Sequence, residues 1–251
     1  MSFSSTALHT ITTSTTKRLG MTAMAAETAL GMGAASAQEG NVLQQPSSDE
    51  IHHNGFMVGI NGLSHTGKGA DVADDEDWGG GGSAQLYGEY TPQAERTFPT
   101  LYLSASQLEE SADTRLFTMD RAQAYGLYPV LGGSDSQIGF FKVGGGAQYV
   151  DAAFGSRMID DTLFTVAVQA RLSLAKTAGS NPTIFYIDAD ASSTFGAIND
   201  KSIQDWKVGL VAAMGEMPLS FEVGYRKLTL DMGYDDKIRF SGPQLGASVH
   251  F

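Results

Sequence analysis

The chain of 251 residues carries 28 acidic and 16 basic residues, and its formal net charge of −12 argues against a nucleic-acid partner, because few cations are available to neutralise phosphates. It contains no cysteine, which excludes disulfides, thiolate metal sites and cysteine nucleophiles. The 30 glycines, with 10% aromatic and 18% charged residues, are typical of a strand-rich protein.

The N-terminal segment has the order of features found in a secretory signal peptide. A basic pair at 17–18 precedes an apolar stretch over 19–35, and Ala-Ser-Ala at 35–37 supplies a small-x-small cleavage site. Glu27 interrupts the apolar stretch, and an amphipathic surface helix is the alternative interpretation. We expect a signal peptide over 1–37, a polar lead-in over 38–50 and a barrel domain over 51–251.

Apolar and polar residues alternate through most of the remaining chain. Between 164 and 174 every even position is apolar, and the odd positions include Gln169 and Arg171. A strand places such a set on one face, whereas a helix would scatter it. The period recurs in ten segments, which predicts an all-β, antiparallel transmembrane β-barrel of about ten strands, with eight as the alternative. The residues predicted to face lipid include Phe164, Val166, Val168, Leu172, Leu174, Leu210, Val223, Leu245 and Val249.

Two of the ten segments change parity. In segment 115–131, Phe117 and Met119 are out of phase with the later apolar residues, and Leu228 and Leu230 are out of phase with those before them. A β-bulge or a wrong strand boundary would explain either shift.

The connections between segments alternate in character. Polar stretches such as 65–82 and 108–113 follow odd segments, and short turns such as 132–135 and 215–218 follow even ones. This is the loop pattern of bacterial barrels, whose longer loops are extracellular.

The polar face carries single charges and glycines, while the other face is almost free of charge. A water-soluble barrel has the reverse arrangement, and a charge on a lipid face would cost roughly 2–4 kcal/mol. Opposite charges in a lumen only ten strands wide are expected to pair and fill it. We predict a charge-filled lumen lined by Lys142, Arg171, Asp188, Asp190, Lys207, Glu222 and Arg226.

The last eight residues resemble the assembly signal of outer-membrane proteins, with a polar residue, a glycine, a hydrophobic residue and a final aromatic residue at set positions. Those positions hold Gln244, Gly246, Val249 and Phe251. The resemblance implies insertion by the barrel-assembly machinery through the C-terminal strand.

A wider resemblance covers most of the chain after residue 50 as scattered short motifs. The motif Gly224-Tyr225-Arg226, an acidic loop and then Ser241-Gly242-Pro243 resemble the closing hairpin of a family of small proteobacterial outer-membrane barrels. Residues 87–108 and 123–143 are similar to the middle strands of that family. The family has no assigned activity, so the resemblance implies an outer-membrane barrel and no catalytic residues.

Three segments resemble ligand sites without meeting their requirements. Residues 62–69 read GLSHTGKG, one residue short of a phosphate-binding loop, and no helical pattern follows them. The acidic residues within 71–77 fit no defined calcium loop, so a solvated loop is favoured over a Ca²⁺ or Mg²⁺ site. His52 and His53 are read as polar lead-in. We predict neither a metal nor a cofactor.

The predicted function is that of an integral outer-membrane barrel with a structural or surface-interaction role and no catalysis. The first alternative is a narrow channel for small solutes or ions. The second is an outer-leaflet lipid-modifying enzyme, whose nucleophile would need an oriented histidine. Of the four histidines after residue 37, only His65 is predicted at an extracellular strand end. Its neighbour Ser64 would point to the opposite face of the strand. The predicted partners are outer-membrane lipid and lipopolysaccharide, and we expect a monomer.

Overall fold

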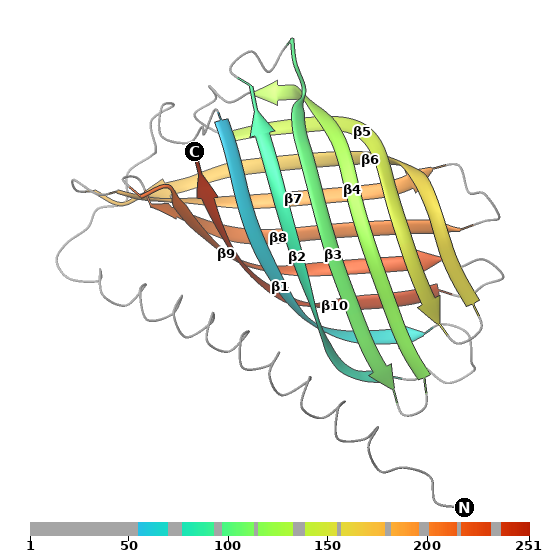
Figure 1. The fold of residues 1–251 in the computed structure, drawn as a ribbon. Helices are drawn as coiled ribbons and strands as arrows, with labels where there is room; N and C mark the ends of the chain where they lie inside the picture. Colours follow the sequence, from blue (N-terminus) through green and yellow to red (C-terminus); the bar gives the residue numbers. More distant parts are fainter. Residues whose placement is uncertain are drawn as a thin grey trace, which may run out of the picture. The chain divides into compact units, whose positions relative to one another are not determined.

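Ten antiparallel strands form a closed barrel in the computed structural model (Figure 1). The structure describes residues 55–69, 77–92, 97–112, 115–132, 139–154, 157–178, 182–195, 201–214, 217–231 and 237–251. The strands are β1 (Gly55–Gly69), β2 (Asp77–Thr91), β3 (Thr100–Ala112), β4 (Arg115–Gly132), β5 (Gly139–Phe154), β6 (Arg157–Lys176), β7 (Thr183–Phe195), β8 (Ser202–Met214), β9 (Leu219–Asp231) and β10 (Lys237–His250).

Each strand pairs with its neighbours in sequence, and β1 pairs with β10 to close the ring. Closure leaves no unpaired strand edge, which a sheet surrounded by lipid requires. The prediction of an all-β antiparallel barrel with ten strands is confirmed, and the alternative of eight strands is wrong. The expected signal peptide, the lead-in, His52 and His53, and the acidic residues of 71–76 lie outside the described residues. Within the described ranges, no helix is long and apolar enough to cross a membrane.

The strands are longer than the sequence pattern predicted. They contain 13 to 20 residues, whereas about 9–11 suffice to cross a membrane. The polar stretches predicted as loops over 65–82 and 108–113 are partly strand, because β1 continues to Gly69, β2 begins at Asp77 and β3 continues to Ala112. Backbone pairing therefore continues beyond the segments in which apolar and polar residues alternate.

Neither predicted explanation of the two parity changes is correct. The β3–β4 register runs without a shift from Thr100↔Leu127 to Ala112↔Arg115, and the β9–β10 register is equally regular. Phe117 and Leu230 are apolar side chains that point into the barrel, and their exposed fractions are 1% and 0%. The described strands do contain register shifts, at Thr66/Gly67, Pro129/Leu131 and Ser173/Ala175.

Apolar side chains cover the outer wall of the barrel. Of the residues predicted to face lipid, six are exposed and the other three, Val166, Val168 and Leu245, are half-buried on the same outward face. Polar side chains of the opposite parity face inward, and many of them are buried. The wall thus separates an apolar exterior from a mixed interior.

Candidate functional site in the barrel lumen

The lumen is filled by two layers of side chains. The layer nearer the hairpins that follow the odd-numbered strands is apolar, and we call it the apolar layer. It consists of Leu108, Phe117, Met119, Val150, Ala152, Ile159, Leu163, Ile203, Leu228, Leu230, Ile238 and Phe240.

Two aromatic rings close the apolar layer from facing walls. Phe117 on β4 and Phe240 on β10 lie four strands apart around the ring, and their ring centroids are 4.8 Å apart. Both are almost completely buried. Phe117 and the other three residues that broke the alternation in the sequence, Met119, Leu228 and Leu230, all belong to this layer.

The second layer is polar, and we call it the charged layer. It lies on the side of the apolar layer that is nearer the end of β10. Each of its residues has a polar partner. It contains Glu89, Arg121, Lys142, Arg171, Asp188, Asp190, Asp205, Lys207, Glu222 and Arg226.

Asp205 is the centre of the first group in the charged layer. It accepts hydrogen bonds from Arg226 Nε at 2.9 Å and Nη2 at 2.6 Å, and from Arg121 Nη1 at 2.5 Å. Arg121 Nη2 donates to the amide oxygen of Gln148, and Arg226 Nη1 donates to that of Gln85, both at 2.8 Å. Arg121 on β4 and Asp205 on β8 come from facing walls, so this group ties the two sides of the barrel together.

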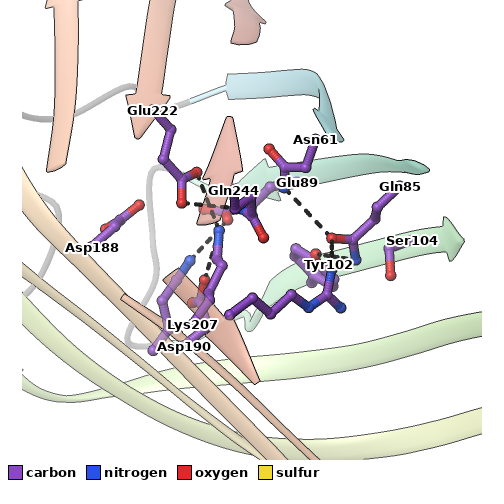
Figure 2. A network of polar contacts seen from close by, with 12 residues as sticks. Asn61, Gln85, Glu89, Tyr102, Ser104, Asp188, Asp190, Lys207, Glu222 and Gln244 are labelled. Carbon is purple, nitrogen blue, oxygen red and sulfur yellow. Dashed lines mark hydrogen bonds and ion pairs between the residues drawn. The ribbon is translucent and has the colours of Figure 1, made fainter. Parts of the chain in front are cut away.

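Lys207 is the centre of the second group. Its ammonium lies 3.0 Å from Asp190 Oδ2 and 3.4 Å from Glu222 Oε2, and Figure 2 shows it between the two carboxylates. Gln244 donates a further hydrogen bond to Glu222 at 3.3 Å. One cation is thus shared by two acids, which is the reverse of the Asp205 group.

Arg171 and Asp188 form the third group, a two-bond pair with both distances at 2.9 Å. The guanidinium also stacks 4.2 Å from the ring centroid of Tyr186. Such planar, two-point pairing is the strong form of a carboxylate contact. Gln169 donates to Glu89 at 3.1 Å across the lumen, from β6 to β2.

All seven charges predicted to line the lumen point inward. Six of them belong to the three groups above, and Lys142 donates to Thr100 Oγ1 at 2.9 Å beside the Phe140 ring. The prediction omitted Glu89, Arg121 and Asp205, although alternation with their outward neighbours Tyr90, Ala122 and Trp206 contained the signal for each.

His65 was predicted at an extracellular strand end, where the polar stretch 65–82 begins, and the structure places it within a strand. It is part of β1 and points into the lumen, where its Nδ1 lies 3.1 Å from Glu110 Oε2. The backbone N–H of Gly67 donates to the other oxygen of Glu110 at 3.1 Å. Ser64 is exposed on the outer wall, as the alternation required, so the two residues do not form a catalytic pair.

A serine and a histidine that the sequence analysis did not connect meet at the other end of the lumen. Ser220 Oγ lies 2.9 Å from His250 Nε2, and only 1% of Ser220 is exposed. A lipid ester on the outer wall has no access to this hydroxyl in the closed barrel.

Two cavities in the charged layer have three lining residues in common, Tyr102, Asp190 and Lys207. In each cavity the centre of a water molecule can occupy about 20 Å³. That is room for about one or two water molecules. Among the described residues no group of three potential ligand side chains could hold a metal ion. These groups neutralise one another and connect facing walls of the barrel.

The four residues of the predicted assembly signal lie on β10 and directly after it. Gln244 and Gly246 face the lumen, and Val249 and Phe251 face outward. Phe251 also extends the ladder, since its N–H donates to the carbonyl of Phe56 at 2.8 Å.

A closed antiparallel wall with an apolar exterior and a cross-paired polar interior defines the class of transmembrane β-barrels. Solved structures similar to this chain include neisserial surface protein A (14% identity, 78% of this chain and 97% of that chain, TM-score 0.36). Two others are the translocator domain of the autotransporter NalP from Neisseria meningitidis (10% identity, 81% and 92%, TM-score 0.34) and the transport unit of the autotransporter AIDA-I from Escherichia coli (10% identity, 78% and 90%, TM-score 0.32). No family model matches the sequence, and no curated protein sequence does.

Proposed function

We propose that the protein is an integral outer-membrane barrel with a closed lumen, whose role is structural or surface-directed and not catalytic. The observation that supports this best is the lumen itself, where an apolar layer and a charged layer fill the cross-section in series. Ten strands are few enough for side chains to occupy the interior. The outward apolar wall requires a lipid or detergent surrounding.

The hydrogen bonds that cross the lumen favour a closed barrel over a narrow channel. Contacts such as Arg121–Asp205 and Gln169–Glu89 cross the lumen between facing walls. A permeating ion would have to break them, and breaking one partner from a buried pair is costly. A non-catalytic role fits the burial of Ser220, whose hydroxyl lies 2.9 Å from His250 Nε2.

Assembly through the C-terminal strand is part of the proposal, with Gln244, Gly246, Val249 and Phe251 as the recognised residues. Replacing Phe251 by aspartate is expected to lower the amount of barrel in the outer membrane far more than total synthesis. Full assembly of that variant would count against the role of the motif.

A planar-bilayer recording tests the closed lumen. The wild-type protein is first shown to be folded by heat-modifiable migration on a gel, and it is then expected to give no steady conductance. Large steady conductance from the folded protein would replace this proposal with the channel. A folded monomer in water without detergent would overturn the membrane barrel altogether.

A further inference from the structure

Charge is distributed unevenly around the outer wall, close to the hairpins that follow the odd-numbered strands. Lys227 on β9 and Arg239 on β10 face outward, half-buried and exposed respectively. Arg239 is directly opposite Thr229, two residues beyond Lys227, so the two cations are diagonal neighbours within reach of one shared anion. In the part of the chain that the structure describes, neither has an ion-pair partner.

The facing sector of the wall is acidic. Asp120 is paired in register with Asp151, and Asp151 with Asp160, so three exposed carboxylates lie side by side on β4, β5 and β6. β4 and β5 lie five strands around the ring from β9 and β10, which is directly across the barrel. An anion approaching the wall is attracted to one sector and repelled from the other.

Two aromatic side chains locate the basic sector relative to the membrane. Trp206 lies directly opposite Lys227 in the β8–β9 register, and Tyr225 precedes Lys227 by one outward position. Both rings are exposed on the outer wall, with centroids 6.0 Å apart. Trp and Tyr mark the level of the lipid headgroups, so Lys227 and Arg239 lie at or just beyond that level.

We infer that Lys227 and Arg239 form a binding site for the phosphate group of an anionic outer-leaflet lipid, with Trp206 and Tyr225 against its apolar part. The inference rests on the proposed function, because it needs the barrel to sit in a membrane. An arginine provides two-point contact to phosphate and a lysine adds a point charge. A third cation, Lys237, is excluded from the site because Asp231 already neutralises it at 3.4 Å.

The test compares the affinity of the full chain, refolded in zwitterionic detergent, for diphosphorylated lipid A and for the same lipid without phosphates. Native mass spectrometry reports the bound lipid. Wild type is expected to prefer the phosphorylated lipid, and the double variant Lys227→Gln/Arg239→Gln is expected to lose about tenfold or more in that affinity. The matched control Lys237→Gln, from the same rim, is expected to stay within about twofold.

Several results would overturn the site. Equal binding of both lipids by wild type, or undiminished binding by the double variant, would do so. Complete competition by millimolar inorganic phosphate would reassign the site to free phosphate. A change of oligomeric state in the double variant, without a change in lipid binding, would mean that the patch contacts a second copy. Heat-modifiable folding into phosphatidylcholine vesicles is measured separately, because its failure would overturn the barrel proposal and not this site alone.

Discussion

Asp205 is the residue on which the charged layer depends most. It is the one acid that contacts both Arg121 and Arg226, whereas Lys207 has two acids of its own. The loss of Asp205 leaves two buried guanidinium groups without a counter-charge. The loss of Asp190 leaves Lys207 still beside Glu222.

We therefore predict that Asp205→Asn lowers the free energy of unfolding by about 3–5 kcal/mol, the usual cost of breaking a buried pair. Asp190→Asn is the matched control, and its expected loss is clearly smaller. Urea unfolding of the two variants in detergent, followed by the heat-modifiable band, measures the difference. Equal losses of unfolding free energy would mean that Asp205 stabilises the barrel no more than Asp190 does, although two arginines share it.

The sequence predicts which charged residues face the lumen but not which ones pair. Alternation along a strand decides the face for each residue, and it would have assigned Arg121 and Asp205 correctly. Their contact joins residues 84 positions apart and depends on β4 and β8 facing each other across a ring of ten. That geometry arises only when the barrel closes with a particular number of strands and stagger.

At the scale of the element, β5 shows how closely the strands approach. Gly144 faces the lumen, and a Cβ added there would lie 1.7 Å from the carbonyl oxygen of Gly126 on β4. Because the atom in the way belongs to the backbone, this clash can be relieved only if the β4–β5 pairing changes. Gly88 on the outer wall of β2 has ordinary space, with its nearest neighbour at 3.6 Å.

Gly144→Ala is therefore expected to destabilise the barrel by about 1–3 kcal/mol, the usual cost of overpacking, and to slow its folding into detergent or vesicles. Gly88→Ala is the control and is expected to leave stability nearly unchanged. Refolding yield and thermal midpoint of the folded band measure both. Normal stability of Gly144→Ala would mean that β4 and β5 pair less closely than described.

The two parity changes explain why the interior was only partly predictable. A strict rule of apolar outside and polar inside makes Phe117 and Leu230 look like errors of register. The structure keeps the register and places both in the apolar layer, because the lumen beyond the charged layer is filled mainly by apolar contacts. The buried His65–Glu110 pair beside Phe240 is a polar exception there. A single-residue pattern cannot distinguish an inward apolar residue from an outward one after a bulge.

At the scale of the whole molecule, the proposed closed lumen has two closures in series, the apolar layer and the charged layer. A permeating ion must pass the Phe117–Phe240 contact as well as the paired charges. Removing charges alone leaves the apolar layer intact, and a narrow apolar constriction excludes water and ions by dewetting. In this proposal the charged layer is one of two barriers.

This predicts the outcome of a variant series in planar bilayers. Arg171→Ala/Arg226→Ala is expected to remain silent like wild type, because the apolar layer still closes the lumen. Phe117→Ala/Phe240→Ala is also expected to remain silent, since the charged layer is then the barrier. Only the combination of all four substitutions opens both layers and is expected to conduct, provided that its heat-modifiable band shows a folded barrel. Steady conductance from the arginine variant alone would mean that the apolar layer does not seal, and the lumen would then be closed by its charges.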